Sequence, residues 1–396
     1  MTARSQVRTW RSPRSERKRV AFVLGSYTLG GAERQLAALV TQRPAFARGV
    51  ELEAVTFLPT TSPAVAAAFD AAGVRHTLID RSTTSAPIFL LRLIRHFART
   101  RPDIVHTVLD GSTGAWGRLA AWVARVPAIF HSDLSLAPGD TSLHRRLRPF
   151  LDRVTARFLP NAYAIADRLT ESGVPRDRID VLPCGVDLSR FRPSREATAH
   201  ARAALGIAPD ARVVGFLGRF VVEKRIDVLL DALLRMRPED RPDVVLLAGD
   251  GPLQAEMRRR IEADPYLRRS CRLLGPIEEV PTFLAALDAL LLTSDVEGLP
   301  NAVLEGMAMA LPVVATSVSD LPRLLDGCGF VVPPGDPEAF AAALARLLRM
   351  PDDERAAMGA RGRHRVEERY DLVRIAAEFW RIHLDAAGAP VLAESL

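Results

Sequence analysis

Two glutamates eight residues apart bound the most distinctive polar segment of the chain, EGLPNAVLE at residues 297–305. Gly298 and Pro300 oppose a regular helix before about residue 300, where a proline suits an early helical position. The spacing therefore predicts Glu297 in a loop and Glu305 about one turn into a helix, where they meet opposite ends of an extended ligand. A carboxylate can accept hydrogen bonds from two hydroxyls, which suits a cis-diol such as a ribose.

Backbone N–H groups can add anion binding at two predicted helix starts. Those of Leu299, Asn301 and Ala302 face the ligand beside Gly298, and a helix N-terminus favours negative charge. Gly31 lies in a Gly-Gly pair before another predicted helix, where a backbone can approach a phosphate closely. An ordinary strand-to-helix turn is the alternative explanation for that pair.

Arg219 and Lys224 form a pair of cations beside a predicted strand end. Lysine occurs only at Lys18 and Lys224 in a chain that otherwise uses arginine, and a compact ammonium on a flexible stem suits a phosphate. Arg219 follows Gly218, and Lys224 is predicted to open the next helix. Both can then neutralise a diphosphate whose charge grows as it departs. Solvated surface cations are the alternative. Together with the two glutamates, they predict a site for a sugar linked to a nucleoside diphosphate.

Apolar strands alternate with amphipathic helices in the first half, which is typical of a parallel α/β architecture. The predicted helices include 32–40, 89–100 and 114–125. The predicted strands are Arg19–Gly25, Val50–Phe57, Arg75–Ile79, Asp103–Val108, Ala128–His131, Arg157–Pro160 and Ile179–Pro183.

The alternation restarts in the second half, after a helix at Arg195–Leu205. Its predicted strands are Arg212–Leu217, Val244–Ala248, Cys271–Leu274, Ala289–Leu292, Val313–Ala315 and Phe330–Val332. We therefore predict a disordered basic tail (1–18), two doubly wound Rossmann-like domains (19–185 and 186–369) and a final helix (370–396) that packs back on the first domain. Open α/β sheets bind ligands at the carboxyl ends of their strands, so the ligand should lie in a cleft between the two sheets.

Composition excludes several classes of protein. A chain of 396 residues with 48% hydrophobic and 25% charged residues is a soluble globular protein, without an apolar run long enough for a membrane span. Three widely spaced cysteines favour a reduced, cytoplasmic compartment. Aromatic content of 6% argues against nucleic-acid binding.

Basic residues account for the formal net charge of +6. They gather in the first 19 residues and in a second cluster, predicted to lie on one helix, of Arg145, Arg146, Arg148, Arg153 and Arg157. Contact with anionic lipid at the inner face of the cytoplasmic membrane is one interpretation. A frayed tail and a solvated helix face are the other.

The segment 297–305 resembles the E-x7-E motif of glycosyltransferase family 4, retaining enzymes with the two-domain GT-B fold. Other motifs agree in order over roughly residues 20–385: the Gly-Gly loop, DIVH at 103–106, IFH at 129–131, VLPCGVD at 181–187, Gly218-Arg219 with Lys224, and AGDGP at 248–252. The resemblance implies transfer of a sugar from a UDP- or GDP-linked donor to a hydroxyl of a glycan or lipid-linked acceptor, as in envelope or exopolysaccharide synthesis.

The resemblance also implies roles for individual residues. Arg219 and Lys224 would bind the donor diphosphate, Glu305 the ribose, and Gly31 would lie near the phosphates. Glu297 and His131 would lie by the transferred sugar, although His131 could equally be a core histidine. No metal or other cofactor is expected, since the cations stabilise the leaving group. One departure is the Ser319-Asp320 segment, where relatives usually have a Gly-Gly pair and then a glutamate, so the loop conformation or donor preference can differ.

Two other classes of function remain open from the sequence. One is a nucleotide-sugar epimerase or NAD-dependent dehydrogenase, although Gly25, Gly30 and Gly31 miss the dinucleotide-binding spacing. The other is a non-catalytic sugar-nucleotide-binding protein of the same fold. Release of free nucleotide from the donor alone would separate an enzyme from a binder.

Overall fold

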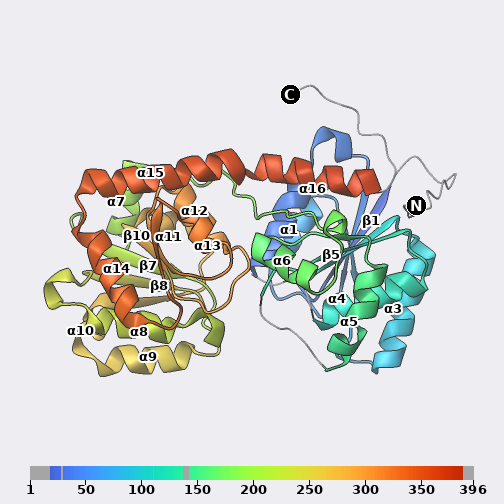
Figure 1. Ribbon diagram of the computed structural model, residues 1–396, viewed down its shortest axis with the longest axis horizontal. Helices are drawn as coiled ribbons and strands as arrows, with labels where there is room; N and C mark the ends of the chain where they lie inside the picture. Colours follow the sequence, from blue (N-terminus) through green and yellow to red (C-terminus); the bar gives the residue numbers. More distant parts are fainter. Residues whose placement is uncertain (1–17, 28–29, 110, 137–141, 387–396) are drawn as a thin grey trace, which may run out of the picture.

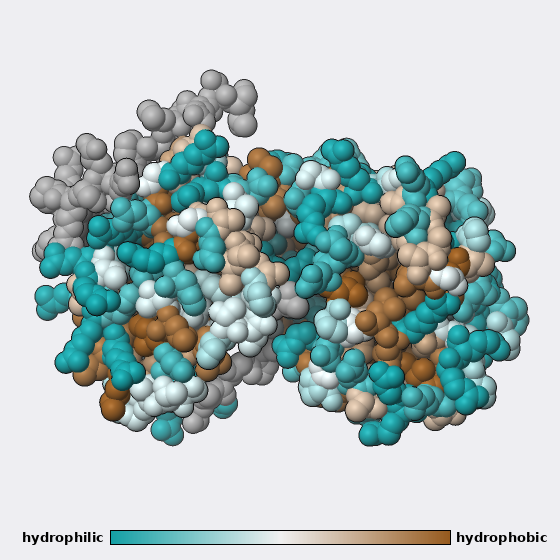
Figure 2. Space-filling model, turned by 180° about the vertical axis from the view of Figure 1, so that it is seen from behind, coloured by the Kyte–Doolittle hydropathy of each residue, from teal (hydrophilic) through white to brown (hydrophobic). Residues whose placement is uncertain are grey.

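The computed structural model describes residues 18–27, 30–109, 111–136 and 142–386 (Figure 1). The basic tail predicted at 1–18 lies outside this range except for Lys18. Two six-stranded parallel sheets form two halves, as the alternation of strands and helices predicts. Seen from behind, the halves are distinct masses with a furrow between them (Figure 2).

The first sheet has the order β3-β2-β1-β4-β5-β6. Its strands are β1 (Arg19–Leu24), β2 (Glu51–Thr56), β3 (Arg75–Leu78), β4 (Ile104–Val108), β5 (Ala128–Ser132) and β6 (Arg157–Phe158). Its helices are α1 (Gly31–Thr41), α2 (Pro63–Ala71), α3 (Ala86–Thr100), α4 (Ser112–Val123), α5 (Ser142–Val154) and α6 (Tyr163–Glu171), with 3-10 turns η1 (Ala45–Ala47) and η2 (Arg176–Arg178).

The second sheet has the order β12-β11-β10-β7-β8-β9. Its strands are β7 (Val213–Leu217), β8 (Val244–Ala248), β9 (Cys271–Gly275), β10 (Ala289–Leu292), β11 (Val313–Thr316) and β12 (Gly329–Val332). The helices around it are α7 (Arg195–Ala204), α8 (Ile226–Arg235), α9 (Gln254–Ala263), α10 (Pro265–Ser270), α11 (Val280–Ala285), α12 (Asn301–Ala308), α13 (Leu321–Leu324), α14 (Pro337–Arg349) and α15 (Asp352–Arg369), with 3-10 turns η3 (Val222–Lys224) and η4 (Pro238–Asp240).

Local sequence explains most of these elements. The central strands β4, β5, β8, β10 and β11 are buried along their whole length, as expected for parallel strands covered on both faces. Several helices begin at a polar cap. Asp336 accepts a hydrogen bond from the backbone N–H of Ala339, and Pro337 occupies the first turn of α14.

Three local predictions were wrong. The strand predicted at Ile179–Pro183 is only an isolated bridge between Ile179 and Phe158, at the sheet edge beyond the two-residue β6. Lys224 does not open α8, because it ends the 3-10 turn η3, and Arg225 adopts φ 46° before the helix begins. Arg157 does not lie on the helix of the basic cluster, since it begins β6.

The end of the chain returns to the first half. Helices α15 and α16 (Leu372–Ala386) run along one side of both halves, and α16 lies over α1 (Figure 1). Phe379 and Trp380 belong to the same hydrophobic cluster as Phe22 of β1. The indole N–H of Trp380 donates to the carbonyl of Leu39 at 3.1 Å. The exact division of the chain into domains at residues 185 and 369 stays a prediction.

Candidate functional site

A cavity of about 800 Å³ lies between the two halves. In each sheet the crossover direction reverses between two strands, β1 and β4 in the first and β7 and β10 in the second, and ligands bind at such points. The segments after β1, β7 and β10, each a loop with the first turns of the element that follows it, line the cavity. They carry most of the predicted site residues: Gly31, Arg219, Lys224, Glu297, Gly298, Leu299, Asn301 and Glu305.

Lys224 and Glu297 meet in an ion pair across the switch point of the second sheet. The Glu297 carboxylate also accepts a hydrogen bond from Ser294 Oγ at 2.7 Å, and the residue is 9% exposed. The ammonium group is thus held at the cavity wall by a carboxylate with a second partner. Since Lys224 is still partly accessible, it can also contact an anion in the cavity.

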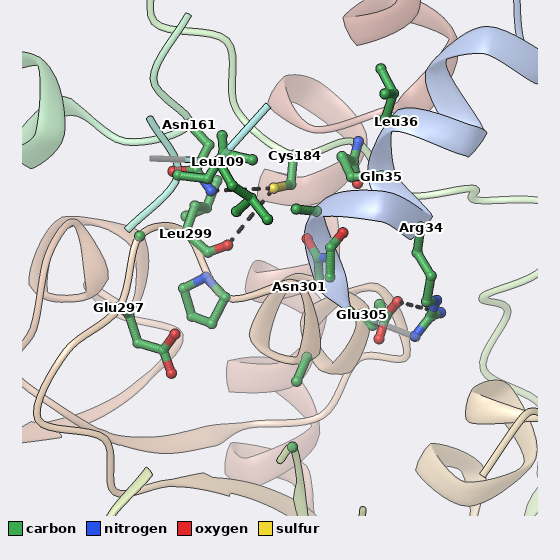
Figure 3. Close-up of a pocket in the computed structure, with 18 of the residues that line it drawn as sticks. Arg34, Gln35, Leu36, Leu109, Asn161, Cys184, Glu297, Leu299, Asn301 and Glu305 are labelled. Atoms are coloured by element: carbon green, nitrogen blue, oxygen red, sulfur yellow. Dashed lines mark hydrogen bonds and ion pairs between the residues drawn. The ribbon is translucent and has the colours of Figure 1, made fainter. Parts of the chain in front are cut away.

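Glu305 faces the first half from the first turns of α12. Its carboxylate lies 3.3 Å from Arg34 Nη2, and that guanidinium belongs to α1. Burial raises the pKa of Glu305 above its ordinary value, while Arg34 and then Arg190 act in the opposite direction. Figure 3 shows Glu297 and Glu305 separated across the cavity, with Leu299 and Asn301 between them. The two carboxylates can therefore meet different ends of one ligand.

Two predicted glycines allow the halves to approach each other. A Cβ at Gly298 would lie 2.3 Å from the carbonyl oxygen of Leu134, and one at Gly31 would lie 3.0 Å from Asn301 Nδ2. That amide nitrogen donates to the Gly31 carbonyl at 3.1 Å. The lack of a side chain at these two glycines therefore lets the two halves pack closely. Both glycines also line the cavity.

Arg219 is exposed and lines the cavity. No hydrogen bond or ion pair of its side chain is found within the part of the chain that the structure describes. The loop that carries it is held by the AGDGP segment, since a Cβ at Gly249 would lie 1.9 Å from the Gly218 carbonyl oxygen. Asp250 accepts the N–H of Gly251 at 2.7 Å, which supports a structural role in that tight turn.

His131 does not join the cavity lining among the described residues. Its side chain is 2% exposed at the end of β5, with Nδ1 2.8 Å from Thr107 Oγ1. The ring packs edge-on against Phe158. A role beside the transferred sugar stays a prediction for this residue.

Several lining residues were not chosen from the sequence. Arg34 lies in the first turn after the Gly-Gly pair, and this position could have identified it as a site residue from the sequence. The sequence around Ser132, Asn161 and Cys184 gave a weak indication of a site or none. Asn161 Nδ2 lies 3.6 Å from Cys184 Sγ. Burial raises the pKa of Cys184 to about 12, so this thiol is neutral near pH 7 and is a poor nucleophile.

The Ser319-Asp320 departure forms a contact between the halves. The Asp320 carboxylate accepts the backbone N–H groups of Tyr163 and Ala164 at the start of α6, at 2.7 and 3.0 Å. Arg323 lies over the Tyr163 ring, 4.7 Å from its centre. The unusual segment therefore caps a helix of the opposite half.

Two kinds of feature are absent from the described residues. No group of three or more histidine, cysteine, aspartate or glutamate side chains is arranged there to hold a metal ion. No helix in that part of the chain combines the length and apolarity that crossing a membrane requires. The expectation that the reaction needs no metal stays a prediction.

Comparisons with known protein families agree with this geometry. The family described as Glycosyltransferase Family 4 matches residues 29–190, and the family described as Glycosyl transferases group 1 matches residues 211–350. The first match covers the first sheet apart from β1, and the second match covers all six strands of the second sheet.

Individual relatives extend the likeness along the chain. An Escherichia coli UDP-Gal:alpha-D-GlcNAc-diphosphoundecaprenol alpha-1,3-galactosyltransferase is 28% identical over 65% of this chain and 69% of its own length. A D-inositol 3-phosphate glycosyltransferase of Actinosynnema mirum is 31% identical over 79% and 82%. HepE of Anabaena, solved with UDP and glucose, superposes with a TM-score of 0.79 at 19% identity, over 93% of this chain and 100% of that chain. The expected GT-B fold is thereby confirmed.

Proposed function

The chain belongs to glycosyltransferase family 4, and from this premise we propose that it moves a sugar from a UDP-linked donor to a hydroxyl of a lipid-linked or glycan acceptor, with retention of configuration. The observation that carries the proposal is the convergence of Arg219, Lys224, Glu297 and Glu305 on one cavity between the halves. The nucleotide is proposed as UDP because the galactosyltransferase relative is named for UDP-Gal and HepE was solved with UDP.

The cations and glycines of the cavity would bind the diphosphate. Arg219 and Lys224 supply positive charge, and the N-termini of α1 and α12 supply backbone N–H groups at Gly31 and Asn301. The Glu305 carboxylate accepts hydrogen bonds from the two ribose hydroxyls. In this arrangement negative charge that develops on the departing diphosphate meets groups already in place.

The chemical step would be a same-face substitution. The bond between the anomeric carbon and the phosphate oxygen breaks, the acceptor oxygen bonds to the same face of that carbon, and its proton passes to the departing phosphate oxygen. Glu297 would lie near the transferred sugar, and its ion pair keeps Lys224 in place. The closure of the cleft excludes water, which limits hydrolysis of the donor.

Nucleotide binding is the first test. We expect UDP to raise the melting temperature more than GDP or ADP at equal concentration, because a ligand that binds only the folded state adds about 2.7 kcal/mol of stability at 100 times its Kd. The measurement is a thermal-shift titration of the full chain. Equal shifts with all three nucleotides, or none, would contradict the UDP assignment.

Turnover is tested with UDP-galactose and a GlcNAc diphosphate bearing a short lipid, the chemistry for which the Escherichia coli relative is named. Release of UDP that increases with the acceptor identifies a transferase. A thermal shift with UDP, but no release of nucleotide from any donor, would instead indicate a binding protein.

We also propose that the first half docks on an anionic membrane surface. Arg145, Arg146 and Arg153 are exposed on α5. Trp122, at the end of α4, is 47% exposed and packs edge-on against Phe150 of α5. Arg148 and Arg157 contribute less, because they pair with Asp152 and Asp180 respectively. An aromatic ring beside arginines suits a lipid interface. Such docking would place the protein in the cytoplasm at the inner face of the membrane.

Vesicle binding tests the docking surface. Neutralising Arg145 and Arg146 to glutamine should weaken binding to phosphatidylglycerol vesicles by roughly fivefold per arginine, from about 1 kcal/mol for each basic residue near the surface. The matched control is Arg258→Gln with Arg259→Gln, two adjacent exposed arginines on α9 of the other half. Equal losses in both double variants would show that only the overall charge matters.

A further inference from the structure

A line of buried polar groups runs from α16 to the cavity wall at the end of β5. His383 Nδ1 lies 2.6 Å from the Phe379 carbonyl oxygen, and His383 Nε2 lies 3.0 Å from His106 Nδ1. His106 Nε2 in turn lies 2.8 Å from Ser132 Oγ. The three side chains belong to residues that are 1 to 7% exposed. Both His106 and Ser132 line the cavity.

The chemistry of these groups sets the direction of every hydrogen bond in the line. A carbonyl oxygen only accepts, so His383 Nδ1 carries a hydrogen. Burial lowers the pKa of His383 to about 4 and that of His106 well below its ordinary value, so each ring is neutral near pH 7 and carries one N–H. His383 Nε2 therefore accepts from His106 Nδ1, and His106 Nε2 accepts from the hydroxyl of Ser132.

This direction determines what Ser132 presents to the cavity. Its single hydroxyl hydrogen is donated to His106, so Oγ can only accept further hydrogen bonds. The Ser132 carbonyl accepts the N–H of Leu109 at 3.1 Å, which holds the end of β5 in place. Phe379, Leu159 and Leu182 line the same cavity and share one hydrophobic cluster. A fixed acceptor beside an apolar wall suits a sugar, which has hydroxyls on its edge and C–H groups on its face.

We propose that Ser132 binds the acceptor substrate, with its Oγ accepting a hydrogen bond from an acceptor hydroxyl, and that His106 and His383 are positioning residues that fix the direction of the Ser132 hydroxyl. The proposal rests on the transferase function above. It assigns α16 a role in acceptor recognition, since the last group of the line belongs to that helix. Arg219, Lys224 and Glu305, on the opposite half, keep their roles toward the donor.

Steady-state kinetics with UDP-galactose and the short-lipid GlcNAc diphosphate test the assignment. Ser132→Ala should raise the acceptor KM about tenfold, the upper range for one hydrogen bond. The UDP thermal shift and the hydrolysis of donor without acceptor should stay unchanged. Ser132→Thr keeps the hydroxyl and should restore most of the affinity.

A double-mutant cycle separates positioning from packing. With His383→Leu, His106 can reverse its hydrogen and donate to Ser132, so the acceptor KM should rise in an otherwise wild-type chain. The same substitution should have no further effect in the Ser132→Ala background, because its effect acts through the lost hydroxyl. The melting temperature of each variant checks that it folds.

The outcomes that overturn the assignment are distinct. An unchanged acceptor KM in Ser132→Ala, additive effects in the cycle, or an equal change in donor hydrolysis would each contradict it while wild-type transfer remains intact. Absence of transfer by the wild-type chain would contradict the transferase proposal and this one together.

Discussion

Replacing Lys224 with methionine should lower the transfer rate constant kcat by about 100- to 1000-fold, the usual cost of removing one fixed group that stabilises developing charge. Methionine keeps much of the length of the lysine side chain and removes its charge. The UDP thermal shift should also decrease, because in the proposed site the ammonium contacts the diphosphate before and after transfer. The measurements are initial rates of UDP release with saturating acceptor and the thermal shift with UDP.

Two comparisons show whether this loss comes from the missing cation. Arg235→Met removes an exposed cation of α8 that pairs with Glu338 outside the cavity lining, and its activity should match wild type. Lys224→Met also leaves Glu297 without its ion-pair partner. If that unpaired carboxylate caused the loss, adding Glu297→Gln would restore activity; we expect no recovery. Near-normal turnover in Lys224→Met would refute the site assignment.

Replacing Glu305 with glutamine should weaken UDP binding by roughly 10- to 150-fold, since hydrogen bonds to a charged group contribute about 1.5 to 3 kcal/mol. The amide keeps the shape of the side chain but accepts through one oxygen only. Arg34, its partner in the ion pair, belongs to α1 of the other half, so the proposed ribose would either share the carboxylate with Arg34 or replace it. Titration of UDP by thermal shift measures the change.

The pH dependence of stability provides a control for folding. Burial raises the pKa of Glu305 above its ordinary value of 4.5. Protonated Glu305 therefore favours the folded state, and this contribution is fully present below about pH 4.5 and is lost as pH rises through the raised pKa. Glutamine does not ionise, so the melting temperature of Glu305→Gln should be no lower than wild type at pH 8. A large drop in the melting temperature of Glu305→Gln at pH 8 would indicate unfolding rather than loss of a ligand contact.

Local patterns predicted most of the fold. The strands in the centre of each sheet follow from short apolar runs that both faces bury, and the predicted β8 (Val244–Ala248) and β10 (Ala289–Leu292) match the structure residue for residue. The failures lie where local pattern competes with tertiary context. Residues 179–183 have a strand-like composition but extend past the short edge strand β6, so they form one bridge and no ladder.

The candidate site was predictable where a motif is contiguous. The positions of Glu297 and Glu305 follow from a glycine, a proline and a helix start within nine residues, and the lysine at 224 is conspicuous because the chain contains only one other. These signals depend on conformational preferences and composition, which a sequence displays directly.

Contacts between residues far apart in the sequence were decided by the tertiary structure. The ion pair between Arg34 and Glu305 joins residues 271 positions apart. In the line from Ser132 to His383, the single hydrogen bond between His106 and His383 joins residues 277 positions apart. Hydrogen bonds and ion pairs depend on distances of about 3 Å and on direction. Only the packing of α16 and of the two sheets sets those distances, whereas the order of residues along the chain determined which side chains were present to use them.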